Sequence, residues 1–332
     1  MPNITSLSLR GIAVALSIGL AGVISGCSTQ PTTPSTTPES ASASSTPVGP
    51  VQFVDDLDNT VVVESTDRVV ACMGSFANMW ELAGGSLVGV SDDAFDQYTI
   101  SSPGVSLIGD FSSPNLEQIL SLEPDFVIMT GASGGRGGGV AQSDLKPSLD
   151  TAGIPVAYFT VTNFTDYLHV MKIMTDITGR GDLYQKYAAD VEAQINEIIE
   201  QVPSAGPAPV VALMTTYSGG TVVQSSSTMT GAMLKDLGVV NIADQNPSLL
   251  KDFSLESLID TNPDFILVVP MGNDTAAALQ ALQEATEANP AWATLDAVKN
   301  GRYLNLEPRL FQYKPNADWA EAYQTLFDIV YA

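Results

Sequence analysis

The pattern of apolar and polar positions is clearest near the middle of the chain. Between Asp182 and Val202 there is no glycine or proline, and apolar residues recur at three- and four-residue steps. The recurring positions are Leu183, Tyr187, Val191, Ile195, Ile198 and Ile199. This spacing predicts a helix with one buried stripe, which Pro203 ends. At 1.5 Å per residue, such a helix is about 30 Å long and can bridge two halves of a molecule.

The segments on either side of this helix repeat one pattern. Asn115 to Thr130 reads NLEQILSLEPDFVIMT, and Ser254 to Val269 reads SLESLIDTNPDFILVV. Each has a Leu-Glu pair, a short amphipathic turn, Pro-Asp-Phe and an apolar run. The repeat indicates two related halves.

Apolar strands alternate with helical stretches in both halves. Strands are predicted at 68–73, 87–90, 125–129, 155–159, 209–215 and 264–269, and helices at 76–83, after 115, 232–237 and 319–330. The segment 51–64 alternates and turns at 55–59, which indicates a β-hairpin. Strands that alternate with helices predict an α/β fold with mostly parallel sheets. Ligands of such folds bind outside the carboxyl ends of the strands, so two facing lobes predict a cleft.

The chain begins with an export pattern. Arg10 is followed by an apolar run from Gly11 to Ile24 that is too short to span a bilayer comfortably. The run ends in Ile24-Ser25-Gly26-Cys27, which resembles a lipobox, the cleavage site of bacterial lipoproteins. The resemblance implies that Cys27 becomes the acylated first residue of the mature protein, carrying chains such as palmitate. An ordinary signal peptide with an incidental cysteine is the alternative.

A tether follows the cysteine. Residues 28–50 are almost all Ser, Thr, Pro and Ala and cannot build a core. The predicted organisation is a signal peptide at 1–26, a lipidated cysteine and tether at 27–50, and a first α/β lobe at 51–180. A bridging helix at 181–203 and a second α/β lobe at 204–332 complete it.

The composition of the chain excludes some classes of function. The formal net charge of the whole chain is −24, which repels nucleic acid. Besides Cys27 the chain has one cysteine, Cys72, inside the apolar run 69–73, where a buried small hydrophobe is expected. No internal disulfide is then possible in the mature protein. We also expect the mature protein to be a monomer.

Enzyme chemistry has little support in the sequence. The single histidine, His169, lies in a helical stretch, where a structural role is more common than a catalytic one. Without a second histidine, neither a Ser-His-Asp triad nor a histidine-based metal cluster is available. The glycine-rich loop 131–139 lacks the spacing of a phosphate-binding loop, and no Cys-x-x-Cys occurs. We therefore predict no catalytic residues, no metal site and no cofactor.

Four runs in fixed order carry a resemblance to a known family. They are RVVACMGSF…LAGGSLVGVSDD, GDFSSPNLEQILSLEPDFVI, FSLESLIDTNPDFILV and AVKNGRYLNLEPRL. The chain from 51 to 332 resembles the ABC-transporter solute-binding proteins of the ferric-siderophore, haem and cobalamin class. The resemblance implies two α/β lobes joined by one long helix, and capture of an iron chelate or corrinoid for a two-subunit permease with its ATPase. With the lipobox it implies a lipid anchor on the outer face of the cytoplasmic membrane, typical of Gram-positive cells. A haem- or metal-ion-binding surface receptor, adhesin or sensor on the same fold stays open.

Residues that follow the predicted strands are the candidates for the ligand-binding cleft. They are Ser75, Phe76, Asp93, Phe95, Phe111, Arg136, Tyr217, Met271, Arg309 and Tyr313. Aromatic rings there suit a large, flat or greasy chelate, although each residue equally fits a loop side chain that only packs. Basic candidates are few, Arg136 and Arg309 with Lys314 nearby, which favours a neutral or weakly charged ligand.

Other ligand chemistries stay open. Haem needs an axial ligand, for which Met73, Met79 and Tyr313 are available. The acidic cluster of Asp92, Asp93 and Asp96 suits either a cation or, more simply, an exposed acidic loop.

Glu117 and Glu256 occupy the same place in the repeated Leu-Glu motif. A carboxylate in the first turn of a helix is favoured by the helix dipole, with Asn115 and Ser254 as caps. In the family that the chain resembles, a glutamate on each lobe meets an arginine pocket of a permease subunit. The resemblance implies that Glu117 and Glu256 are this docking pair.

Overall fold

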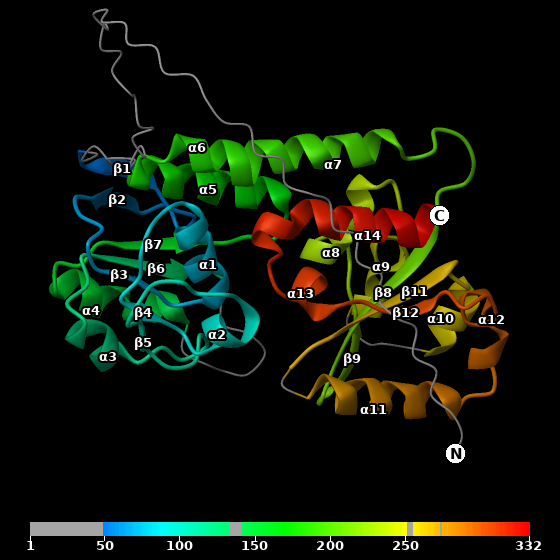
Figure 1. Cartoon of the computed structure of the whole chain (residues 1–332). Coiled ribbons are helices and arrows are strands. Elements are labelled where there is room, and N and C mark those ends of the chain that lie inside the picture. Colours follow the sequence, from blue (N-terminus) through cyan, green and yellow to red (C-terminus); the bar gives the residue numbers. More distant parts are fainter. Residues whose placement is uncertain (1–48, 133–140, 251–254, 273) are drawn as a thin grey trace, which may run out of the picture. The chain divides into compact units, whose positions relative to one another are not determined.

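The computed structural model describes residues 49–132, 141–250, 255–272 and 274–332 (Figure 1). Residues 45–332 form one compact unit. Cys27, the tether up to residue 48, Arg136 and Ser254 lie outside the described residues. Within the described ranges, no helix combines the length and the apolar character needed to cross a bilayer.

The first lobe is a parallel sheet with a hairpin beside it. The hairpin pairs β1 (Val51–Val54) with β2 (Thr60–Val63), as predicted for 51–64. The sheet has the order β5-β4-β3-β6-β7, and every pair in it is parallel. Its strands are β3 (Val69–Ala71), β4 (Gly89–Val90), β5 (Ser106–Leu107), β6 (Phe126–Thr130) and β7 (Val156–Phe159). The helices of this lobe are α1 (Gly74–Leu82), α2 (Asp93–Gln97), α3 (Leu116–Ser121), α4 (Lys146–Thr151) and α5 (Phe164–Thr178).

The second lobe repeats this plan with one addition. Its sheet has the parallel order β10-β8-β11-β12, and β9 pairs antiparallel with β8. The strands are β8 (Val210–Tyr217), β9 (Gly220–Val223), β10 (Val240–Asn241), β11 (Phe265–Pro270) and β12 (Tyr303–Asn305). The helices are α8 (Met229–Asp236), α9 (Ile242–Gln245), α10 (Leu255–Thr261), α11 (Thr275–Glu287), α12 (Asp296–Lys299), α13 (Pro308–Phe311) and α14 (Trp319–Tyr331). The predicted class, two α/β lobes with mostly parallel sheets, is confirmed.

The bridging segment differs from the uninterrupted α-helix that the sequence predicts. It consists of α6 (Gly181–Tyr184), a π-helical turn (Gln185–Ala189) and α7 (Asp190–Glu200). The carbonyl of Tyr187, inside the π-helical turn, accepts a hydrogen bond from the hydroxyl of Tyr167 at 2.8 Å. A π-helical turn widens the helix locally, and here it lets the carbonyl reach a buried side chain of α5. A tertiary contact of this kind leaves no periodic trace in the sequence.

The bridging segment contacts both lobes. Its π-helical turn packs against α5 of the first lobe, and α7 packs along α14 of the second (Figure 1). Val191, Ile195 and Ile198 are buried, as their spacing predicts. Beneath the segment, one hydrophobic core continues through both lobes. In this core, the ring of Trp319 lies 5.6 Å from the ring of Phe164.

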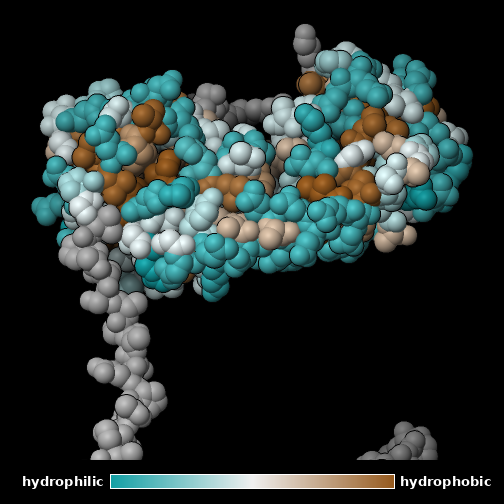
Figure 2. Space-filling model, turned by 90° about the horizontal axis from the view of Figure 1, so that it is seen from above, coloured by the Kyte–Doolittle hydropathy of each residue, from teal (hydrophilic) through white to brown (hydrophobic). Residues whose placement is uncertain are grey.

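The face of the molecule that lies above the bridging segment is mostly polar. Figure 2 shows hydrophilic residues covering most of the face seen from above, interrupted by smaller hydrophobic patches. The 37 acidic residues against 13 basic ones in the whole chain make this surface strongly acidic. Such a surface is consistent with a protein that does not bind nucleic acid.

Candidate functional site

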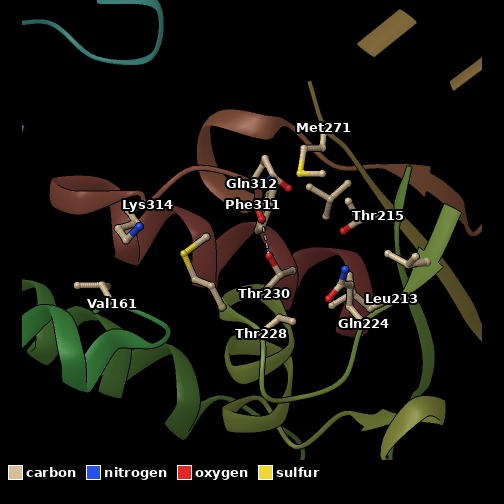
Figure 3. A pocket seen from close by; sticks show the side chains of 13 residues that line it. Val161, Leu213, Thr215, Gln224, Thr228, Thr230, Met271, Phe311, Gln312 and Lys314 are labelled. Carbon is tan, nitrogen blue, oxygen red and sulfur yellow. Dashed lines mark hydrogen bonds between the residues drawn. The ribbon is translucent and has the colours of Figure 1, made fainter. Parts of the chain in front are cut away.

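A cavity of about 440 Å³ opens at the carboxyl ends of the second-lobe strands (Figure 3). Most of its wall comes from the second lobe, and Val161, which follows β7, belongs to the first. The lining residues are Val161, Leu213, Thr215, Val222, Gln224, Thr228, Met229, Thr230, Val269, Met271, Phe311, Gln312 and Lys314. The position agrees with the rule that α/β sheets bind ligands beyond the carboxyl ends of their strands.

Local structure fixes the wall of this cavity. The hydroxyl of Thr230, at the start of α8, donates a hydrogen bond to the carbonyl of Phe311 in α13 at 2.8 Å. A Cβ atom at Gly231 would overlap the main chain of Ser225, so glycine is required for the tight approach of α8 to the preceding loop. The start of α8 and α13 are thus fixed to each other beside the cavity.

The segment from Lys314 to Asn316 joins the second lobe to the first. The hydroxyl of Tyr98 donates to the carbonyl of Lys314 at 3.1 Å. The side-chain amide of Asn316 donates to the carbonyl of Ser75 at 3.0 Å and to the side-chain oxygen of Asn78 at 2.8 Å. We call these three hydrogen bonds the clasp. They tie the wall of the cavity to α1 and α2.

The clasp places one ammonium group beside the first lobe. The Nζ atom of Lys314 lies 3.9 Å from the sulfur of Met73 and 5.5 Å from the centre of the Phe76 ring. Burial lowers the pKa of Lys314 to about 8, while the charge of Asp93 acts in the opposite direction. The group is therefore close to half-protonated in mildly alkaline solution.

Met271 is the predicted cleft residue that the structure places in the lining of this cavity. Ser75 and Phe76 are buried instead. Phe76 is 0% exposed and packs edge-on against Phe159, with ring centres 6.2 Å apart. Both residues lie at the start of α1, which runs back into the core directly after β3. Phe76 is therefore part of the core behind the cavity wall and does not line the cavity.

Asp93, Phe95 and Phe111 lie at the carboxyl edge of the first-lobe sheet. The carboxylate of Asp93 accepts hydrogen bonds from the amide of Gly74 at 3.0 Å and the hydroxyl of Ser91 at 2.5 Å. Burial raises its pKa. Phe95 and Phe111 are 51% and 37% exposed, which is unusual for such large apolar side chains. They form an exposed aromatic rim on this lobe.

The buried side chain of Gln142 holds the loop that carries Phe111 in place. The side chain is 3% exposed and donates to the carbonyls of Cys72 at 2.7 Å and Phe111 at 2.6 Å. Its amide oxygen accepts from the amide of Thr130 at 2.9 Å. One buried side chain thus joins the ends of β3 and β6 to the loop that carries Phe111.

Arg309, one of the two predicted arginines, does not belong to the lining of this cavity. The guanidinium of Arg309 is paired with Asp318 at 2.5 Å, Glu321 at 2.7 Å and Glu307 at 3.5 Å. Arg309 instead borders a separate cavity of about 220 Å³, because α13 carries it to the side that faces α14. Arg136 lies outside the described residues.

The two predicted tyrosines lie next to the cavity rather than in its lining. Tyr217 ends β8, where it pairs with Gly220 in β9 and its ring covers Gly219. Tyr313 is half-buried, and burial together with the charges of Asp93 and Asp96 raises its pKa. The sequence did not separate either position from that of Met271, since all three were expected to follow a strand.

Sequence reasoning missed most of the lining. The run Gln224–Thr230 contributes four lining residues just before and at the start of α8. The sequence signal available for these lining residues was that the run is polar and lies between a strand and a helix. The strand β9 was not predicted, so the contribution of Val222 was not either.

Histidine and acidic residues give no metal centre in the described part of the chain. No group of three or more His, Cys, Asp or Glu side chains there is arranged to hold a metal ion. His169 is half-exposed, with Nε2 3.7 Å from a carboxylate oxygen of Asp56. Cys72 is fully buried, as predicted, and burial raises its pKa.

Comparison with known proteins agrees with this architecture. The sequence profile of the family described as periplasmic binding protein matches residues 69–310. An ABC transporter substrate-binding protein from Listeria monocytogenes is similar in structure, with a TM-score of 0.62 and 23% identity over 80% of this chain and 99% of that one. No curated protein sequence matches the chain.

Two further solved structures are of proteins that are named for the ligands they bind. The periplasmic haem-binding protein HutB of Vibrio cholerae has a TM-score of 0.63 and 21% identity, over 81% of this chain and 100% of that one. The siderophore-binding protein BauB, solved with two acinetobactin molecules and ferric iron, has a TM-score of 0.63 and 16% identity, over 85% of this chain and 97% of that one.

The two α/β lobes and the bridging segment are the fold of the solved substrate-binding proteins to which the chain is similar. The chain belongs to the periplasmic binding protein family, because the family profile covers most of its length. Proteins of this family act outside the cytoplasmic membrane, where they bind substrates for transport.

Proposed function

We propose that this protein is the extracytoplasmic substrate-binding subunit of an ABC importer that captures a ferric siderophore, or a related iron chelate or corrinoid. The observation that carries the proposal is the cavity at the strand ends, which is apolar apart from hydroxyl and amide groups and Lys314. A haem-binding protein and a ferric-siderophore-binding protein share the fold, which supports this ligand class.

The cavity favours a ligand of low charge. Among the lining residues within the described ranges, Lys314 is the one charged side chain, and Arg309 is already paired with three carboxylates. A triply negative catecholate complex requires several cations, whereas a ferric hydroxamate or a corrinoid does not. The exposed rings of Phe95 and Phe111 are proposed to cover the apolar part of such a ligand.

Haem is the second candidate. Met229 and Met271 both lie in the lining and supply thioether sulfurs, which are haem ligands in other proteins. This candidate predicts an absorbance band of bound haem that shifts when Met229 or Met271 is replaced by leucine.

Delivery to a two-subunit permease with its ATPase is part of the proposal. Glu117 lies in the first turn of α3 and Glu256 in the first turn of α10, and both are exposed. The side chain of Asn115 accepts a hydrogen bond from the amide of Gln118 at 3.2 Å, so α3 has its own cap. The glutamates are therefore available to arginines of a partner, one from each lobe.

The lipid anchor is proposed from the segment around Cys27, which lies outside the described residues. Acylation of Cys27 would hold the protein at the outer face of the cytoplasmic membrane. Mass spectrometry of the mature N-terminus tests this, and an unmodified first residue other than Cys27 would refute it.

The function is tested with the purified protein and four probes: a ferric hydroxamate, a ferric catecholate, haemin and cobalamin. Equilibrium titration followed by tryptophan fluorescence is expected to show micromolar or tighter binding of one probe class. A protein that binds none of the four is not the proposed receptor.

A further inference from the structure

Lys314 differs from the other residues that line the cavity. The other described lining residues are apolar or carry neutral hydroxyl and amide groups, so this ammonium is the single charge on the part of the wall that the structure describes. In Figure 3, Lys314 and Val161 lie at one end of the drawn lining, and Leu213 and Gln224 at the other. The cavity therefore has one charged end and one uncharged end.

The charged group has only weakly attractive neighbours. Its closest recorded partners are the sulfur of Met73 at 3.9 Å and the ring of Phe76 at 5.5 Å. Among the residues that the structure describes, no carboxylate forms an ion pair with Lys314, whereas Arg309 in the same segment has three. The charge of Asp93 attracts the ammonium without forming an ion pair with it, so the cost of burying the charge is offset only in part. A bound anion would offset more of that cost.

The clasp holds Lys314 in this position. Its carbonyl accepts the hydrogen bond from Tyr98, and Asn316, two residues further on, is fixed to Ser75 and Asn78. Asn316 is 1% exposed and has a φ of 53°, a left-handed conformation that asparagine tolerates better than most residues. The chain at Lys314 and two residues after it is thus anchored to the first lobe.

We propose that Lys314 is an anion subsite of the cleft, which takes a single carboxylate or other singly charged group of the ligand. The proposal rests on the proposed function, since it concerns the same cavity. It goes further in assigning one residue to one chemical group. A second anionic group on the ligand would find no second cation among the described lining residues.

The test uses pairs of probes that differ in anionic groups alone. One pair is haemin and its dimethyl ester, and the other is a neutral ferric trihydroxamate and the same chelate with one carboxylate arm. Affinities are measured at pH 7 for the wild type, Lys314→Met and Lys314→Arg. Methionine keeps the length and the apolar contact with Met73, and arginine keeps the charge.

The wild type is expected to bind the anionic member of at least one pair about tenfold more tightly than the neutral member. Lys314→Met should lose this preference, mainly because it binds the anionic member more weakly, and Lys314→Arg should retain much of the preference. Equal binding of both members by the wild type, or an unchanged preference in Lys314→Met, would overturn the subsite alone. The proposed function would be overturned if the wild type bound none of these probes and also bound neither cobalamin nor a ferric catecholate. The subsite would then fall with it.

Discussion

The side-chain amide of Asn316, in the second lobe, donates a hydrogen bond to the carbonyl of Ser75, in the first lobe, at 3.0 Å. A second hydrogen bond from the same amide reaches Asn78 at 2.8 Å. These bonds lie far along the chain from the bridging helix, so the lobes are joined by more than one connection. A pair of lobes fixed in this way favours a site that is largely formed before the ligand binds.

Removing two of the three hydrogen bonds of the clasp should weaken the fold. Asn316→Gly keeps the left-handed conformation available but removes both side-chain hydrogen bonds, each worth about 1 kcal/mol, and leaves buried groups without a partner. We expect a loss of about 1–3 kcal/mol in the free energy of unfolding measured in urea. Asn316→Ala should lose about 1 kcal/mol more because of backbone strain. Wild-type stability of Asn316→Gly would show that the clasp does not join the lobes.

Gln142 is expected to matter for both stability and binding. Gln142→Ala leaves the carbonyls of Cys72 and Phe111 and the amide of Thr130 without this partner. Unpaired buried groups cost about 1–3 kcal/mol each, so we expect a loss of at least about 2 kcal/mol in urea unfolding. Ligand affinity should also fall, because the loop that carries Phe111 is released. The matched control is Gln118→Ala on the exposed face of α3, and an equally small effect of both substitutions would contradict the positioning role.

The titration of Lys314 gives a pH dependence with a definite sign. Its pKa is lowered to about 8 in the folded protein from an ordinary 10.5, so the unfolded chain binds more protons between these values. The free energy of unfolding of the wild type should therefore rise with pH through this window, relative to Lys314→Met. Between pH 7.5 and 9.5 the difference should grow by about 1–2 kcal/mol.

The groups around Lys314 do not reverse this sign. They are Asp93, Tyr98 and Tyr313 with the uncharged Met73 and Phe76, and burial raises the pKa of both tyrosines, which stay protonated in the window. Because both proteins contain these groups, their contributions cancel in the comparison. Parallel pH profiles of wild type and Lys314→Met would show that the ammonium is not desolvated.

Charge reversal tests permease docking. The double variant Glu117→Lys with Glu256→Lys should abolish uptake in cells, because each lysine would face an arginine of the partner. Ligand affinity of the purified protein and its melting temperature should change little, since both side chains are exposed first-turn residues. Normal uptake by a stably expressed double variant would leave the helix-dipole explanation as sufficient.

The sequence predicted those parts of the fold that depend on local pattern. Val191, Ile195 and Ile198 were predicted to be buried from their spacing alone, and β6 and β11 from their continuous apolar runs. The π-helical turn was not predictable, because it depends on a contact between Tyr167 and the main chain 20 residues away.

The site was less accessible to sequence reasoning than the fold. Residues that follow strands were identified as a group, but their side chains divide between core and cleft according to tertiary packing. Phe76 turns into the core with α1, whereas Met271 faces the cavity. Arg309 looked available because its three carboxylate partners at 307, 318 and 321 come together only in the fold. Sequence gives the candidate positions, and packing decides which way each side chain points.

The central claim is that the cavity between β8, α8 and α13 binds the transported ligand. Val222 lies on β9 opposite Thr215 and both line this cavity, so Val222→Trp fills it without disturbing the strand pairing. We predict that titration with the probe bound by the wild type shows at least a tenfold weaker affinity for Val222→Trp, and an unchanged affinity for the surface control Gln118→Trp. Equal affinity of wild type and Val222→Trp, with the variant folded, would place the ligand elsewhere and contradict the account.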